Sequence, residues 1–152
     1  MRLVVETFIE ASREKVFDLA RDVDAHLRTS QATGERAVAP GKTTGLLDLG
    51  DLVTFEGVHL GVRQRLTARV VSMERPVRFA DEQVRGVFRR LRHVHEFEDH
   101  AGATLMRDTL EWTSPLGFLG VLADLLFVER HLRSFIFAKQ QALKRLAESL
   151  PA

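Results

Sequence analysis

Two histidines stand two residues apart in the segment Val87 to Glu98, and an aspartate follows in the segment Ala103 to Thr113. Imidazole titrates near neutral pH, and a carboxylate beside it fixes its orientation and tautomer. His93, His95 and Asp108 are therefore candidates for acid–base chemistry on a bound molecule. The alternative is a polar network that satisfies itself and orients an oxygen of that molecule.

Both segments alternate like strands, and residues two apart on a strand point to the same face. In each segment one face is more apolar than the other, and we expect that face to point into the protein. In the first segment this face carries Leu91, His93, His95 and Phe97, and in the second it carries Met106, Asp108, Leu110 and Trp112.

The turn residues Asp99 to Gly102 join the two segments, which predicts an antiparallel hairpin. In one register Asp108 lies opposite His93, and a shift of two residues places it opposite His95. Directly opposed residues have Cβ atoms about 4.5–5.5 Å apart. Both registers therefore predict a His–Asp pair on the inner face.

Three further strands are predicted before this hairpin, at Leu52 to Leu60, Val62 to Glu74 and Val77 to Val84. A bulge at Gly61 or Gly86 would reverse the faces assigned to them. Without one, the inner face carries Phe79, Asp81 and Gln83 on one strand and Val53, Phe55, Gly57 and His59 on another.

The ends of the chain complete an α+β pattern. Arg2 to Glu10 reads as a first strand and Glu35 to Ala39 as another short one. Between them two short helices are predicted, capped by Ser12 and by Asp24 and ending near Gln31. Gly41 to Asp51 has three glycines and no period, so we expect a mobile loop. From Leu119 a helical stripe continues through Leu122, Leu125, Val128, Leu132, Phe135, Ala142 and Leu146.

A long helix can cover only part of a sheet of this size, and a twisted sheet curls around it. Where the inward side chains do not meet, a hollow remains that suits a small ligand. The sequence therefore predicts a curved antiparallel sheet wrapped around the C-terminal helix.

Composition narrows the protein class. The 152 residues fit one domain, 1–152, with a formal net charge of +1 and no cysteine. Disulfides, zinc–thiolate sites and a cysteine nucleophile are thereby excluded. The apolar run Leu116 to Val128 is shorter than the ~20 residues of a membrane span. No signal peptide is recognised, so the expected location is cytoplasmic.

The run Phe79-x-Asp81-Glu82, Gly86-x-Phe88, His93-x-His95-x-Phe97, Met106-x-Asp108 and Pro115-x-Gly117 resembles bacterial SRPBCC (START-like, birch-pollen-allergen-like) proteins. The polyketide cyclase/dehydrase-like group is the nearest match, along essentially the whole chain. The resemblance implies the helix-grip fold: a seven-stranded antiparallel sheet around the C-terminal helix, with two small helices after the first strand. It also implies a cavity for a lipid, polyketide, isoprenoid or quinone-like molecule. Val87 and Leu91 depart from the proline and tryptophan common at these positions.

Other side chains suggest three further interpretations. His-x-His on one strand face can chelate a metal with His59 or Asp108 as third ligand, but we expect no metal and no cofactor.

Arginines on the outer face, such as Arg90 and Arg92, suggest nucleic acid or an acidic protein, but there is no stacking aromatic row and the net charge is small. We expect no nucleic-acid partner.

The run Leu116 to Val128 suggests a membrane or dimer contact, but we expect it to be the buried start of the helix around which the sheet curls.

The sequence thus predicts a carrier or sensor that holds a small hydrophobic or amphipathic molecule. The alternative is a cyclase- or dehydratase-type enzyme with His93 or His95 as base and Asp108 as the residue that orients it. The expected ligand-binding residues are Phe55, His59, Phe79, Asp81, Gln83, Leu91, His93, His95, Phe97, Met106, Asp108, Leu110 and Trp112.

Overall fold

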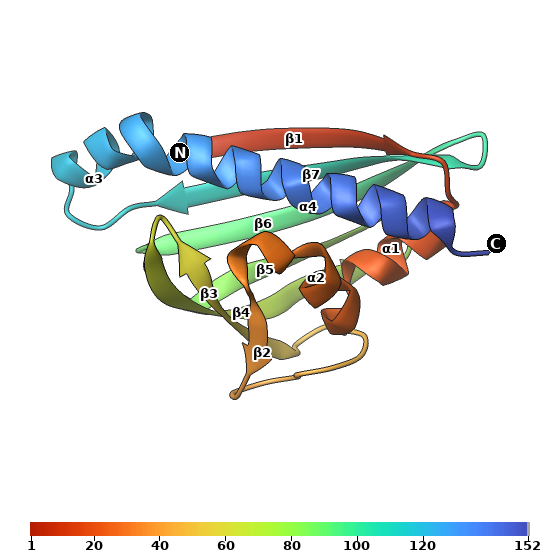
Figure 1. Ribbon diagram of the computed structural model, residues 1–152, viewed down its shortest axis with the longest axis horizontal. Helices are drawn as coiled ribbons and strands as arrows, with labels where there is room; N and C mark the ends of the chain where they lie inside the picture. Colours follow the sequence, from red (N-terminus) through yellow and green to blue (C-terminus); the bar gives the residue numbers. More distant parts are fainter. Residues whose placement is uncertain (152) are drawn as a thin grey trace.

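The computed structural model describes residues 1–151 and contains one antiparallel sheet that curls around a long C-terminal helix (Figure 1). The strand order across the sheet is β1-β7-β6-β5-β4-β3-β2. This is the predicted helix-grip arrangement. The strands are β1 Arg2–Ile9, β2 Arg36–Val38, β3 Leu52–His59, β4 Val62–Glu74, β5 Arg78–Arg85, β6 Arg90–His100 and β7 Ala103–Thr113.

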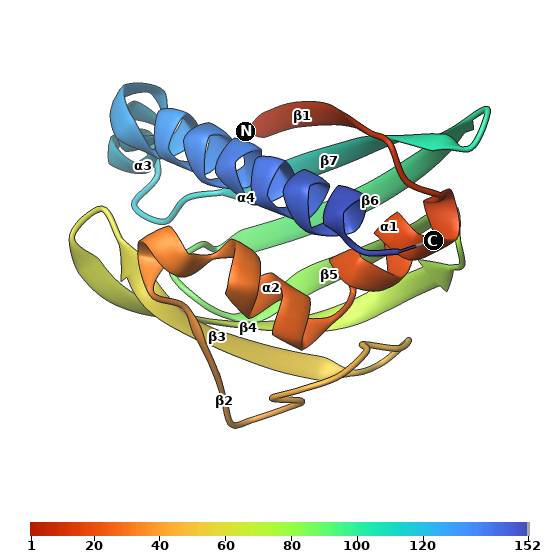
Figure 2. The ribbon, with the colours of Figure 1, turned by 45° about the vertical axis from the view of Figure 1, so that its right-hand side comes forward.

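The helices lie on the concave side of the sheet. The long helix α4 packs against β1, α1 and α2, so α2 faces the sheet beside α4 (Figure 2). The pocket between these layers is lined by helices on one side and by strands on the other. The helical segments are α1 Arg13–Ala20, α2 Val23–Thr29, the 3₁₀ turn η1 Gln31–Thr33, α3 Phe118–Ala123, the π-helical segment η2 Asp124–Val128 and α4 Glu129–Ser149.

The caps of the two small helices were predicted in part. The Ser12 hydroxyl accepts a hydrogen bond from the Lys15 amide at the start of α1, as expected. Helix α2 is capped by Asp22 and not by Asp24. The Asp24 carboxylate instead accepts hydrogen bonds from Thr44 Oγ1 and the Gly45 amide.

Gly41 to Asp51, between β2 and β3, was expected to be a mobile loop, and it contains neither a helix nor a ladder strand. Several backbone hydrogen bonds nevertheless attach it to its neighbours. The Lys42 amide donates to the Leu52 carbonyl, and the Leu47 amide donates to the Arg21 carbonyl. Leu47 is buried in the core. This loop therefore closes one end of the sheet against α2.

The strand registers decide which residues face the helix. His95 pairs with Asp108 across β6 and β7, which is the second of the two predicted registers. The irregularities in the ladder between β4 and β5 fall at 67/68 and 70/72, so neither Gly61 nor Gly86 carries a bulge. The inward faces assigned from alternation are therefore kept. Strand β6 starts later than predicted, at Arg90.

The expectation for Leu116 to Val128 was wrong. Helix α3 and segment η2 extend beyond the ends of the strands, so no sheet layer is available to cover them (Figure 1). Phe118 is 79% exposed and Leu125 is 64% exposed. Gly120 and Asp124 are buried. Asp124 is 1% exposed and accepts hydrogen bonds from Trp112 Nε1 and Ser114 Oγ. Within residues 1–151, no helix is long and apolar enough to cross a membrane.

Asp124 is the polar attachment of the α3–η2 segment to β7, and this role can be tested by substitution. We expect Asp124→Ala to lower the free energy of unfolding by about 1–3 kcal/mol, because it leaves the Trp112 indole N–H buried without an acceptor. Urea unfolding followed by tryptophan fluorescence measures the change. Asp124→Asn keeps an acceptor oxygen and should lose less. Equal losses in the two variants would contradict this role.

Candidate functional site

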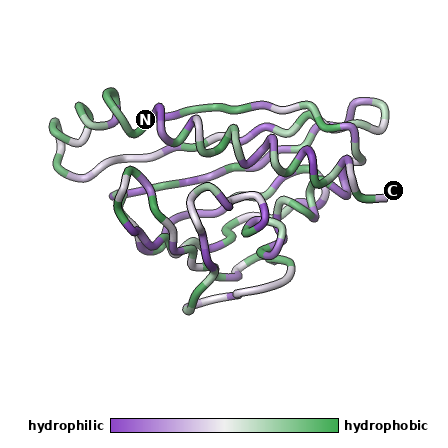
Figure 3. The backbone as a smooth tube through the Cα atoms, viewed as in Figure 1, coloured by the Kyte–Doolittle hydropathy of each residue, from purple (hydrophilic) through white to green (hydrophobic). Residues whose placement is uncertain are grey.

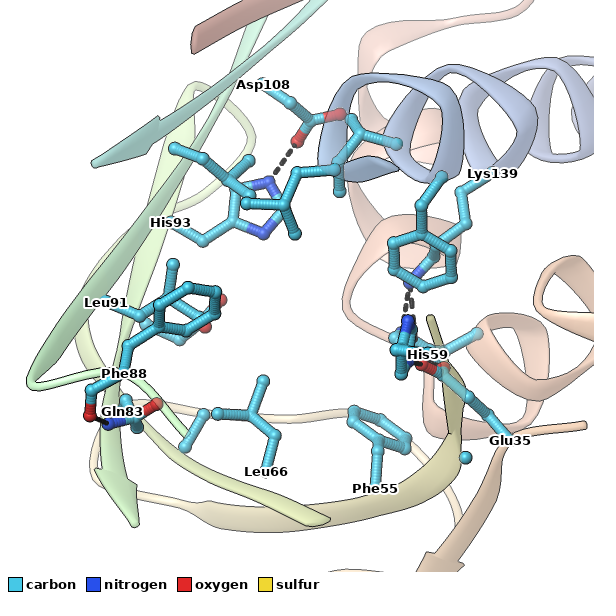
Figure 4. Close-up of a pocket in the computed structure, with 18 of the residues that line it drawn as sticks. Glu35, Phe55, His59, Leu66, Gln83, Phe88, Leu91, His93, Asp108 and Lys139 are labelled. Atoms are coloured by element: carbon cyan, nitrogen blue, oxygen red, sulfur yellow. Dashed lines mark hydrogen bonds and ion pairs between the residues drawn. The ribbon is translucent and has the colours of Figure 1, made fainter. Parts of the chain in front are cut away.

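A pocket of about 440 Å³ lies between the concave face of the sheet and helices α2 and α4. This size is in the range of small-molecule sites. Apolar side chains form most of its wall, including Phe55 from β3, Leu66 from β4 and Leu91 from β6 (Figure 4). Polar side chains gather at two places. Figure 4 places His93 and Asp108 on one side of the pocket and Lys139, His59 and Glu35 on the other.

Most of the predicted ligand-binding residues line this pocket, because the alternation had assigned the strand faces correctly. The lining residues among them are Phe55, His59, Phe79, Asp81, Gln83, Leu91, His93, His95, Met106, Asp108 and Leu110.

Phe97 and Trp112 face inward but do not reach the pocket, which corrects the prediction. Phe97 packs edge-to-face on Phe17 of α1, with ring centroids 5.2 Å apart. Helix α1 therefore covers it. Trp112 lies at the other end of the sheet, where its indole donates to Asp124 at 2.9 Å. Both are core residues because helices pack directly on these ends of the strands.

Asp108 is the centre of the first polar group, which we call the Asp108 network: Asp81, His93, His95, Asp108 and Gln140. Asp108 Oδ1 lies 2.9 Å from His93 Nε2 in a hydrogen bond. His95 Nδ1 lies 2.6 Å from the same oxygen, in an orientation that makes an ion pair but no hydrogen bond. His95 Nε2 contacts Asp81 Oδ2 at 3.2 Å. The one buried carboxylate thus holds both imidazoles.

Helix α4 holds Asp108 from behind through Gln140, which is 1% exposed. Gln140 Nε2 donates to Asp108 Oδ2 and, at 3.0 Å, to the Val5 carbonyl. Gln140 Oε1 accepts from Thr7 Oγ1 at 2.8 Å. The amide is therefore fully used, as a buried polar group requires. These bonds join β1, β7 and α4 directly behind the pocket.

The two imidazoles differ in charge. Burial lowers the pKa of His95, but the charge of Asp108 and its contacts with Asp108 and Asp81 outweigh burial and raise the pKa to about 9. For His93, burial and the neighbouring charge of His95 lower the pKa despite the hydrogen bond to Asp108. At neutral pH His95 is therefore an imidazolium and His93 a free base. Burial raises the pKa of Asp108, but the two histidines hold it well below its usual range.

Five residues form the second polar group, which we call the Lys139 network: His26, Glu35, His59, His131 and Lys139. Lys139 Nζ donates to His26 Nδ1 at 2.7 Å, and His26 Nε2 lies 2.6 Å from Glu35 Oε2. Glu35 Oε1 lies 3.3 Å from His59 Nε2. His59 Nδ1 and His131 Nε2 share a hydrogen bond of 3.0 Å. The chain of contacts runs from the start of α4 to the interior of the pocket.

Charges in the Lys139 network are separated by a neutral ring. Burial, followed by the charge of Lys139, lowers the pKa of His26 to about 4, so this imidazole can accept a hydrogen bond from the lysine ammonium. Burial raises the pKa of Glu35, but hydrogen bonds from His26 and His59 bring it well below its usual range. Burial also lowers the pKa of Lys139, against the opposing charge of Glu35. The pocket therefore has a second charged pair.

Sequence reasoning missed Lys139 and Gln140, although a signal was present. The apolar stripe of the C-terminal helix has a gap between Phe135 and Ala142, and these two polar residues stand within it, one turn after Phe135 and Ile136. A polar residue at an inward position of such a helix indicates a site. His26 and Glu35 carry no comparable signal, because long-range packing alone brings them together.

One part of the Asp108 network has the donor set of a metal site. Donor atoms of Asp81, His93 and His95 all lie within 4.8 Å of one another. His59, the other possible third ligand, belongs to the Lys139 network and lies apart from this group. In the same cluster, the positive charge of protonated His95 balances the negative charge of its neighbours Asp81 and Asp108. That no metal is bound stays a prediction.

The sequence matches the family described as "Polyketide cyclase / dehydrase and lipid transport" over residues 9–135. The chain belongs to this family, within the SRPBCC superfamily suggested by the residue pattern. Among functionally curated proteins, none matches the chain in sequence.

Solved structures share the fold along the whole chain. TTHA0849 from Thermus thermophilus is 19% identical with a TM-score of 0.80, covering 99% of this chain and 100% of that one. The ZhuI aromatase/cyclase from Streptomyces sp. R1128 is 14% identical with a TM-score of 0.77, covering 97% and 93%. Major latex-like protein 151 from Panax ginseng is 11% identical with a TM-score of 0.75, covering 99% and 98%. At these identities the likeness establishes the fold alone.

The high pKa of His95 predicts a pH-dependent contribution to stability. Because the folded pKa of about 9 lies above the unfolded value of 6.5, protonated His95 stabilises the fold fully below pH 6.5. This contribution is lost as pH rises through about 9. We therefore expect the difference in free energy of unfolding between the native protein and His95→Gln to shrink over this range.

Chemical denaturation at a series of pH values measures that difference. His100→Gln is the matched control, because His100 lies exposed at the end of the same strand. The same pH series on His100→Gln corrects for effects that are common to replacing a histidine of this strand. A pH-independent difference for His95→Gln would contradict the charge assigned to this imidazole.

Proposed function

We propose that the protein is a carrier or sensor that binds a small, largely apolar molecule in the pocket. The observation that carries this proposal is the pocket of about 440 Å³, whose wall is apolar except for the Asp108 and Lys139 networks. A fully packed core would leave no such space, since protein interiors are close-packed. Membership of a family described in part by lipid transport supports the same function.

The ligand is expected to be amphipathic, because each polar network reaches the pocket wall. The Asp108 network offers the neutral imidazole of His93 as an acceptor, whereas both ring nitrogens of His95 already face carboxylates. A hydroxyl group of the ligand, which can donate, fits this acceptor. Apolar contacts with Phe55, Leu66 and Leu91 would provide most of the affinity, because buried apolar area contributes about 25 cal/mol per Å².

Filling the pocket tests the proposal. The neutral fluorescent probe N-phenyl-1-naphthylamine should bind the native protein with increased emission. Leu66→Trp places a larger ring on the inner face of β4 and should weaken binding by at least about tenfold, since steric overlap removes apolar contact. Val71→Trp is the matched control on the same strand, where Val71 is 40% exposed, and it should bind the probe like the native protein. Equal binding by both variants, or no binding by the native protein, would refute the pocket as the ligand site.

An enzyme of cyclase or dehydratase type is the second candidate function, favoured by the opposite protonation states of His93 and His95. His93 as a free base would take a proton from the carbon next to a ketone. His95 as an imidazolium, held between Asp81 and Asp108, would stabilise the negative charge of the enolate that forms. The proton taken by His93 would then pass to the leaving hydroxyl, which departs as water. Asp108 would orient both rings. The roles of acid and base are thus assigned more narrowly than from the sequence, which left either histidine as the base.

Proton exchange separates the two functions without a known substrate. If the protein is an enzyme, we expect it to accelerate the exchange of the protons next to the carbonyl of 2-tetralone in deuterated buffer. NMR measures the exchange rate. His93→Gln should lower this rate by about 10²-fold or more while probe binding is kept, because a general base contributes 10²–10⁴. Exchange that is no faster than in buffer leaves the carrier function. A drop in exchange that only follows weakened binding would also argue against catalysis.

A further inference from the structure

Several exposed apolar residues surround the opening of the pocket. Leu60, Val87, Leu116 and Leu119 all line the pocket and are all exposed. They come from three segments far apart in the sequence: the turn between β3 and β4, the loop between β5 and β6, and the start of α3. We call them, with α3 and η2, the mouth rim. The opening of the pocket is therefore apolar on its outside as well as on its inside.

The α3–η2 part of the mouth rim is formed mainly by exposed apolar side chains. Figure 3 shows this projecting end of the chain as mostly hydrophobic. Between Ser114 and Val128 the only ionisable residue is Asp124, which is buried. Phe118, Leu125 and Phe127 are each at least 60% exposed. An exposed apolar patch of this kind marks a surface that meets an apolar partner.

Arginines border the mouth rim. Arg85 and Arg89 each stand two residues from Val87, and Arg90 follows directly. Arg89 also lies in a small hollow beside Gly117 and Val121 of the α3 segment. Arg130 begins the chain after η2. Within residues 1–151 none of these four arginines forms an ion pair with a carboxylate, so this edge carries uncompensated positive charge.

We propose that the mouth rim docks on the surface of an anionic lipid bilayer. Leucine and phenylalanine side chains would enter the acyl boundary while the arginines meet the head groups, as in interfacial helices. The pocket would then open toward the apolar phase, and a hydrophobic molecule could pass between bilayer and pocket without crossing water. This inference holds whether the pocket carries its ligand or converts it.

A second copy of the chain fits the mouth rim less well. In a two-fold dimer the same patch meets itself, so the arginine border of one copy would face the arginine border of the other. Like charges placed together across an interface are unfavourable. An anionic bilayer instead complements both the apolar tips and the charge around them.

Vesicle flotation tests the proposal with the full chain. We expect the protein to float with vesicles of phosphatidylcholine and phosphatidylglycerol, and much less with phosphatidylcholine alone. Added salt should weaken the association because it screens the arginines. Phe118→Ser/Leu125→Ser should lower the bound fraction at least about tenfold, since two large side chains lose their apolar burial. Neither residue lines the pocket, so binding of N-phenyl-1-naphthylamine should not change.

Matched variants separate the alternatives. Phe8→Ser removes a 47% exposed phenylalanine from β1, away from the mouth rim, and should float like the native protein. Arg89→Gln/Arg90→Gln should reduce binding to the anionic vesicles, whereas Arg145→Gln on the last turns of α4 should not. No flotation by a protein that binds the probe would overturn the proposal. So would a dimer in solution that Phe118→Ser/Leu125→Ser converts to monomer, because a second copy would then cover the rim.

Discussion

The buried carboxylate of Asp108 is the interaction on which the site depends. It lies on an inner strand with an exposed fraction of 2% and is held from behind by Gln140 of α4. A lone charge in this place would cost several kcal/mol. Two imidazoles on β6 and an amide on α4 compensate it, so the position of the helix over the sheet and the protonation of the histidines are fixed together.

This constraint explains why the two histidines behave differently although they stand two residues apart on one strand. His95 contacts both Asp81 and Asp108, and two carboxylates keep a proton on it despite burial. His93 has only the shared oxygen of Asp108 and a charged neighbour, so burial decides and the ring stays neutral. A positively charged ring and a hydrogen-bond acceptor therefore stand side by side on the pocket wall, which suits either the recognition of a hydroxyl group or proton transfer.

Strand residues of the site could be predicted because alternation with a period of two is a local property. Asp81, His93 and Asp108 were placed on the inner face from the sequence, and the turn before β7 limited the register to two choices. What failed depends on distant packing. Phe97 is inward but covered by α1, and Lys139 meets His26 and Glu35 only because α2 folds against α4. A periodic pattern within one segment of the sequence does not indicate where a helix will pack across the sheet.

The same reasoning explains the exposed α3–η2 segment. Its composition is that of a core helix, and the sequence was interpreted so. A core helix needs a layer to cover, however, and this segment extends past the strand ends. Asp124 turns inward, where Trp112 and Ser114 hold it. The cost of leaving so many leucine and phenylalanine side chains in water persists in the free protein, and contact with an apolar surface at the mouth of the pocket would remove it.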